Sequence, residues 1–188
     1  MKKTLLILAG LLLLVSISMA ESNRCSFNSF ERVGDSRSNI AIEINITNHD
    51  TLAGFQIPFS YMDDNLDLVC DSISFINSRC AGFDALDAQI DNESKSALIM
   101  GIYQTNPAVD KQPLLPGRGL IARAYFTIND IDDRRIQGKK QLRFIKKRFT
   151  NNAAILDFSF WKPDGESVDA IYENNVFELD SDNQSSPE

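Results

Sequence analysis

An alternation of side chains over residues 54–61, within the stretch 52–61, constrains the fold more than any other feature of this chain. Large apolar residues occupy every second position, namely Phe55, Ile57, Phe59 and Tyr61. The positions between them hold Gly54, Gln56, Pro58 and Ser60. A spacing of two predicts a β-strand with one face in a core and the other toward water.

The same alternation recurs along the chain. Turn-forming residues separate the apolar segments, and no amphipathic helix longer than about two turns is expected. The predicted strands cover residues 40–46, 54–61, 66–76, 88–90, 97–103, 120–128, 141–149, 155–161 and 175–179, with at most one short strand in 21–37. Residues 66–76 do not keep strict parity, which predicts a bulge. This order favours an all-β fold, an antiparallel β-sandwich of about nine strands.

The apolar positions of three of these strands predict that the strands share one core. Their apolar positions are Ile42, Ile44, Phe55, Ile57, Phe59, Ala124 and Phe126. We also place Leu120 with Ala122 and Ala124 on the inner face of its strand.

The N-terminus has the pattern of a signal peptide. Lys2 and Lys3 precede an apolar run at residues 5–15, and Ala20 precedes the expected cleavage site. We therefore predict a signal peptide at 1–20, a single domain at 21–180 and a disordered tail at 181–188. The protein is expected to be exported, to the extracellular space or cell surface or to a periplasm, with no membrane insertion after cleavage.

The charge of the chain is acidic and argues against a nucleic-acid partner. The net charge of −7 becomes −9 when the two signal-peptide lysines are removed. One stretch, residues 134–148, is locally basic. A solvated hairpin is the favoured interpretation, and a patch that binds an anion or acidic polymer is the alternative.

The sequence contains no catalytic or metal-binding signature. His49 is the only histidine, it lies in a predicted turn, and no Gly-x-Ser-x-Gly motif is present. Asp63, Asn65 and Asp67 copy the start of a calcium loop, but Leu68 stands where such a loop needs glycine. We expect no catalytic residue, no metal site, no cofactor and no enzyme activity.

Three further features leave alternatives open. Cys25, Cys70 and Cys80 allow at most one internal disulfide, and free buried thiols are an equal alternative. Asn45, Asn92 and Asn183 begin glycosylation sequons, which are common by chance. Trp161 with Phe158 and Phe160 forms either a sugar-stacking platform or, as we favour, part of the core and its edge.

Residues 31–130 resemble a bacterial cohesin-type domain. The resemblance rests on residues 33–35, 40–46, Asn48 before 52–56, Tyr61, Leu66 and 71–75. Residues 116–122, which lead to 125–127, are similar to the late glycine-then-strand signature of the family. The resemblance implies a nine-stranded jelly-roll sandwich related to cellulose-binding modules. Such a fold places the strand at residue 58 inside a sheet, and since proline lacks a donor we expect a bulge or a local break there.

The resemblance also implies a function and a site. It implies extracellular protein–protein binding, commonly to a calcium-loaded dockerin, in polysaccharide-degrading assemblies. The partner of such domains docks on the outer face of the strand at 54–61, which gives Gly54, Gln56 and Ser60 as partner-binding residues. Gly54 and Gln56 stand where dockerin-binding members carry asparagine and aspartate, so altered partner choice is expected. The alternatives are a surface adhesion or carbohydrate-binding sandwich without a dockerin partner, and third an exported enzyme.

Overall fold

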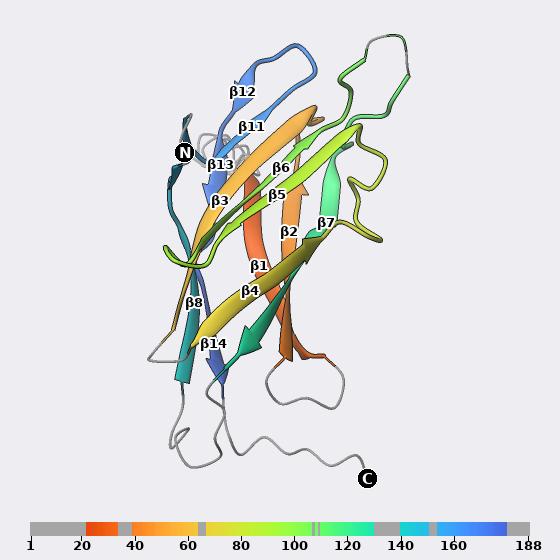
Figure 1. Ribbon diagram of the computed structural model, residues 1–188. Helices are drawn as coiled ribbons and strands as arrows, with labels where there is room; N and C mark the ends of the chain where they lie inside the picture. Colours follow the sequence, from red (N-terminus) through yellow and green to blue (C-terminus); the bar gives the residue numbers. More distant parts are fainter. Residues whose placement is uncertain are drawn as a thin grey trace, which may run out of the picture.

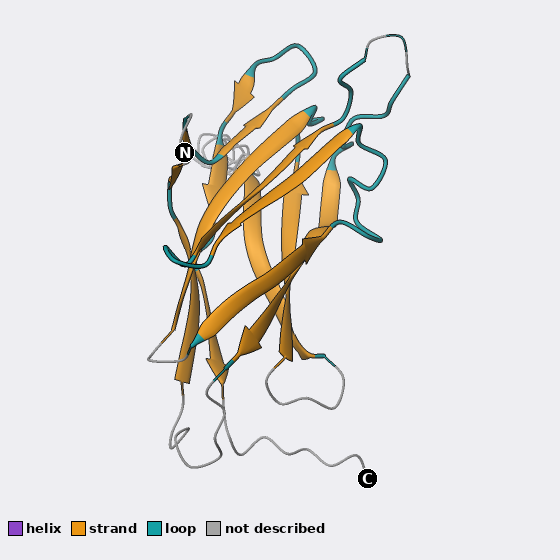
Figure 2. Cartoon of the chain, in the orientation of Figure 1, coloured by secondary structure: helices purple, strands orange, loops and turns teal. Residues whose placement is uncertain are grey.

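The computed structural model describes residues 22–33, 39–63, 67–106, 108, 110–129, 140–150 and 154–179. The described part contains fourteen strands and no helix (Figure 2). Nine strands have five or more residues, and the other five have two or three. The predicted all-β sandwich of about nine strands is therefore confirmed, with short strands added to it.

One sheet has five strands in the order β13-β1-β2-β7-β4. The strands are β13 (Ala170–Tyr172), β1 (Asn23–Arg32), β2 (Asn39–Asn48), β7 (Gly117–Ile128) and β4 (Leu68–Ser74). All neighbours are antiparallel except β1 and β13, which pair in parallel. The ten-residue β1 corrects the expectation of one short strand in residues 21–37.

The second sheet has seven strands, arranged around β3 (Figure 1). One edge of β3 (Gly54–Asp63) pairs with β6 (Ser96–Ile102), which pairs with β5 (Ala85–Asp91). The other edge pairs first with β11 (Ser159–Trp161) and then with β8 (Lys140–Lys146). Outside these lie β12 (Ser167–Val168) and β14 (Asn175–Leu179), and a separate hairpin joins β9 (Phe149–Thr150) to β10 (Ile155–Leu156).

A change of partner strand along one edge of β3 explains how the sheet accommodates Pro58. The Tyr61 N–H donates to the carbonyl of Lys95 beside β6, at 3.0 Å, so odd-numbered backbone groups of β3 face β6 and even-numbered ones face the other edge. On that other edge β11 pairs up to Gln56, and β8 begins at Phe59. The missing N–H of Pro58 thus faces the gap between two partner strands, which confirms the expected break.

The core lies between the two sheets and includes all seven residues predicted to share it from the strands at 40–46, 54–61 and 120–128. Phe55, Ile57, Phe59 and Tyr61 point into it from β3, and Ile40, Ile42, Ile44 and Ile46 point into it from β2. Aromatic rings bridge the layers: the centroids of Phe27 and Phe144 lie 4.8 Å apart, and those of Tyr61 and Phe126 lie 5.1 Å apart.

Three register shifts occur among the described strands, and two of them change the side-chain alternation in strands predicted from the sequence. The register of β4 shifts between Cys70 and Ser72, which confirms the bulge expected in residues 66–76. A second shift in the β2–β7 pairing lies between Ile44 and Asn45. It buries both Ile121 and Ala122 and pairs Leu120 with Asn45 on the outer face, so the placement of Leu120 on the inner face was wrong.

Several predictions fall outside the described residues. They are the signal peptide at 1–20, the tail at 181–188, the sequon at Asn183 and the basic residues of 134–139. Within the described part, no helix is long and apolar enough to cross a membrane.

Candidate functional site

The candidate site is the outer face of the seven-stranded sheet, formed by side chains that point away from the core. Its end nearest the start of β3 carries one row of apolar residues across four strands: Trp161, Gly54, Ile102 and Ala85. Ile102 is 39% exposed. The next row is more polar, with Ser159, Gln56, Met100 and Asp87.

Gly54 lies under the indole ring of Trp161. A Cβ atom at residue 54 would stand 2.5 Å from two ring carbons of Trp161, a distance that no side chain tolerates. Glycine is therefore required here for packing, and the flat Trp161 ring extends the apolar row. A glycine at an outward position of a strand was the sequence signal for this close approach.

The Gln56 side chain already makes a hydrogen bond within the folded chain. Its Nε2 donates to the carbonyl oxygen of Asp157 at 2.6 Å, and the Asp157 carboxylate accepts from Arg148 Nε at 2.8 Å. Gln56 thus holds the segment between β10 and β11 against β3.

The β9–β10 hairpin covers the middle of this face. The hairpin lies against β6, and Leu98 of β6 and Phe149 of β9 are both buried although neither belongs to the main core cluster. Leu98 points outward, because its neighbours Ala97 and Ile99 point into the core. A second, small apolar contact therefore forms on the outside of the sheet.

Ser60 lies beyond the hairpin. It is 3% exposed, and among the described residues its Oγ has no hydrogen-bond partner. Ser60 lines a groove of about 490 Å³ together with Met62, Ile145, Lys95 and Lys147. The three residues predicted from the sequence, Gly54, Gln56 and Ser60, thus share the outer face of β3, but the chain covers part of that face itself.

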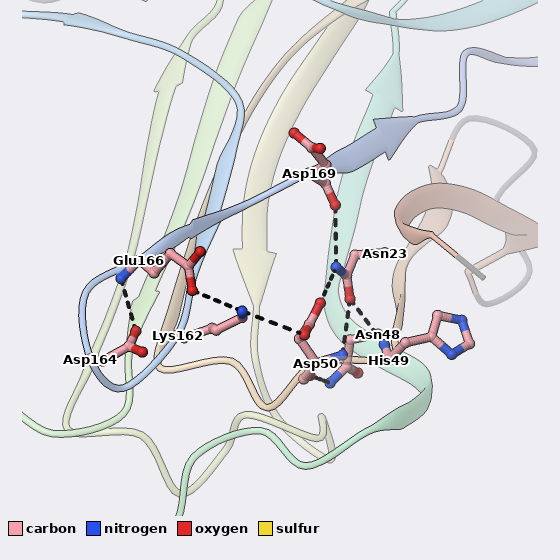
Figure 3. Close-up of polar contacts among 8 residues, drawn as sticks. All are labelled: Asn23, Asn48, His49, Asp50, Lys162, Asp164, Glu166 and Asp169. Atoms are coloured by element: carbon pink, nitrogen blue, oxygen red, sulfur yellow. Dashed lines mark hydrogen bonds and ion pairs between the residues drawn. The ribbon is translucent and has the colours of Figure 1, made fainter. Parts of the chain in front are cut away.

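A polar network fixes the β11–β12 connection beside Trp161 (Figure 3). Lys162 Nζ lies 2.9 Å from Glu166 Oε2 and 3.9 Å from Asp50 Oδ1. Asn23 Nδ2 donates to Asp50 Oδ2 at 2.8 Å and to the Asp169 carbonyl at 3.2 Å. The network joins the β2–β3 turn, the start of β1 and the β11–β12 hairpin, so Trp161 is held in a defined position.

The aromatic trio proposed as a sugar platform is divided between two faces. Phe160 is buried in the core, and Phe158 packs edge-on against Phe160 and Tyr172, with ring centroids at 5.1 Å and 5.5 Å. Trp161 alone points to the outer face. This agrees with the favoured interpretation, core plus edge.

The remaining candidates for chemistry have structural explanations. His49 is exposed in the turn after β2, and its backbone N–H donates to Asn23 Oδ1 at 2.9 Å. Cys25, Cys70 and Cys80 are free and buried, and burial raises the pKa of each thiol. In the described part of the chain, no group of three or more His, Cys, Asp or Glu residues could hold a metal ion.

Comparisons with known proteins identify the fold. No protein-family model matches the chain, and no curated protein matches its sequence. Among solved structures, the cohesin in the OlpC cohesin–Doc435 dockerin complex of Clostridium thermocellum is 13% identical, with a TM-score of 0.61 over 84% of this chain and 92% of that one. The sixth cohesin of scaffoldin B from Acetivibrio cellulolyticus, in complex with the Cel5 dockerin, is 11% identical, with a TM-score of 0.57 over 82% and 96%.

A third structure agrees with these two. The cohesin in the OlpA cohesin–Doc918 dockerin complex of C. thermocellum is 7% identical, with a TM-score of 0.57 over 83% of this chain and 97% of that one. The chain has a cohesin-like fold, an all-β sandwich in which sequence identity to the solved cohesins is very low.

Proposed function

We propose that this protein is an exported, non-catalytic binding module that takes a protein partner on the outer face of its seven-stranded sheet. The support is the cohesin-like fold together with the complexes above, in which the cohesins are bound to dockerins. A partner of dockerin type is therefore our first candidate.

The observation that carries this proposal is the apolar row Trp161, Gly54, Ile102 and Ala85. Interfaces draw most of their binding energy from a few buried aromatic and aliphatic anchors, and tryptophan is enriched among them. The Trp161 ring packs over Gly54, and Ile102 is exposed on the other side of Gly54. The outward positions 54, 56, 58 and 60 of β3 carry no charge, so desolvating this strand on binding incurs no penalty for a buried ion.

Partner choice is expected to differ from that of dockerin-binding cohesins. Gly54 and Gln56 stand where dockerin-binding cohesins carry asparagine and aspartate, and the Gln56 side chain already donates to the Asp157 carbonyl. The surface offered to a partner is therefore mainly apolar and aromatic.

The test is a binding titration of the purified protein against a panel of calcium-loaded dockerins, with two matched variants. Ile102→Lys places a charge in the proposed interface and should weaken binding by about tenfold or more. Ile171→Lys is the control, because Ile171 is similarly exposed, at 47%, but lies in β13 of the other sheet. Equal affinities in both variants would move the interface off this face, and no binding to any dockerin would exclude this class of partner.

Export is the second part of the proposal and has its own test. The n-region, the apolar run and Ala20 predict that the exported form begins at Glu21. N-terminal sequencing of protein recovered from the culture medium or periplasm should return Glu-Ser-Asn, and an intact Met1 would contradict the prediction.

A further inference from the structure

A polar groove lies on the opposite side of the molecule from the proposed interface. It has a volume of about 400 Å³ and is lined by Arg24, Ser26, Asn28, Thr47, His49, Arg118 and Glu173. The volume falls within the range of about 300–1,000 Å³ that is usual for small-molecule sites. No apolar side chain is among the lining residues, which separates this groove from the apolar row and from the Ser60 groove.

Strand pairing places two arginines on either side of Thr47. Arg24 pairs with Thr47 across β1 and β2, and Thr47 pairs with Arg118 across β2 and β7. Two strand spacings separate the Cα atoms of the arginines, roughly 10 Å. Arginine side chains are long enough for both guanidinium groups to reach one ligand lying over Thr47.

The two arginines differ in how they are held. Arg24 Nη1 lies 2.7 Å from Glu173 Oε1, so its guanidinium is oriented before any ligand arrives. Arg118 is exposed, and within the described part of the chain its side chain makes no hydrogen bond or ion pair. The lining holds two arginines against one glutamate, Glu173, and on a chain of net charge −7 this local excess of positive charge suits an anionic group.

The rest of the lining favours a hydroxylated ligand. Ser26, Asn28 and Thr47 offer hydroxyl and amide groups, and Asn28 Nδ2 donates to Ser26 Oγ at 3.0 Å, which fixes both. A peptide would need apolar anchors for affinity, and the lining provides none. A neutral sugar would normally stack on an aromatic ring, and no aromatic residue other than His49 lines the groove.

We propose that this groove binds a carboxylate-bearing saccharide, such as a segment of an acidic polysaccharide. Arg118 and Arg24 bind the carboxylate, and the polar residues of β1 and β2 bind the hydroxyl groups. The proposal does not depend on the protein-binding function, because the two surfaces lie on different sheets.

Calorimetric titration with three matched probes tests the proposal. The probes are a galacturonic acid oligomer, the same oligomer with its carboxyl groups reduced to alcohols, and an oligoglutamate of equal charge. We expect the uronate oligomer to bind at least about tenfold more tightly than either of the others, because only it offers both carboxylates and hydroxyls.

Two charge-matched variants assign the site. Arg118→Gln should weaken uronate binding by about tenfold or more, whereas Arg143→Gln, which removes an exposed arginine from β8 of the other sheet, should not. Loss of affinity in both variants, or in neither, would overturn the assignment. Equal binding of the reduced oligomer or of oligoglutamate would overturn the ligand class. Dockerin binding, where it is found, should be unchanged in Arg118→Gln.

Discussion

The Asn92 side chain has a structural role that no sequence motif indicated. Asn92 Oδ1 accepts from the Tyr61 hydroxyl at 2.6 Å and from the Cys70 N–H at 2.8 Å, and Asn92 Nδ2 donates to the Cys70 carbonyl at 3.0 Å. One amide thus pairs with both backbone groups of Cys70 and links the two sheets. A glycan on the Asn92 sequon would be attached through this same Nδ2, next to β4.

The buried thiols give a prediction about pH. Burial raises the pKa of the Cys70 thiol from 9.0 to about 12, and it also raises the pKa of Cys25 and Cys80. The unfolded chain therefore loses these protons at lower pH than the folded chain. The free energy of unfolding should be insensitive to thiol ionisation below about pH 7.5. It should fall as the pH rises through about 8.5–9 and beyond, by up to about 1.4 kcal/mol per pH unit for each thiol.

Urea unfolding from pH 7 to pH 10.5 measures this effect. The variant Cys70→Ala is the comparison, since it removes one titrating group and should flatten the decline. A decline of equal slope in the variant would show that Cys70 makes no contribution. In the same buffers, a thiol reagent should label the native protein far more slowly than the unfolded chain.

At the scale of elements, one side chain locks the start of β7. Arg79, in the connection between β4 and β5, donates from Nη1 to Asn48 Oδ1 at 2.8 Å and from Nη2 to the Leu115 carbonyl at 2.6 Å. The Arg79 guanidinium lies over Gly117 and its aliphatic stem over Gly119, and both glycines have a φ of +154°. The glycine-then-strand pattern thus reflects a backbone conformation and a close approach that both require glycine.

Gly119→Ala tests this arrangement. An added Cβ would lie 3.0 Å from Arg79 Cδ and would occupy a strained backbone conformation, so we expect a loss of roughly 1–3 kcal/mol in the free energy of unfolding. Gly82→Ala is the matched control, because a Cβ there meets nothing within 4 Å. Chemical denaturation should separate the two variants, and equal stabilities would refute the role given to Gly119.

At the scale of the whole molecule, the two sheets share one aromatic core. Phe27 of β1 stacks on Phe144 of β8, and Phe126 of β7 meets Tyr61 of β3 edge-on. These contacts join strands from both layers, and their interlocking predicts that the sandwich unfolds in one cooperative transition.

Core truncations measure that coupling. Phe55→Ala and Phe126→Ala each remove a fully buried ring from a different sheet and should cost about 3–5 kcal/mol. Ile155→Ala is the control, since this side chain is exposed and its loss should change stability by no more than about 0.5 kcal/mol. A first transition that affects only one sheet would contradict a shared core.

The sequence by itself determined the positions of the long strands β2, β3, β6 and β7 and the buried face of most of their residues. Alternation along one strand is a local property, so the core positions of β2, β3 and β7 followed from spacing alone. The fold class followed as well. An irregularity at Pro58 was expected from its missing N–H together with the resemblance, which placed this strand inside a sheet.

Only the tertiary structure decided how the outer surfaces are built. Each of its main features joins segments that are distant in sequence. The partner strand of β3 changes from β11 to β8 beside Pro58, and the Trp161 ring lies over Gly54. Gln56 donates a hydrogen bond to Asp157, which is 101 residues away. The alternation of β1 was likewise hidden, since its outward residues Arg24, Ser26 and Asn28 acquire a shared role only beside β2 and β7. Periodicity encodes the direction in which a side chain points, but its neighbour is set by strand order and register, which depend on the packing of the whole chain.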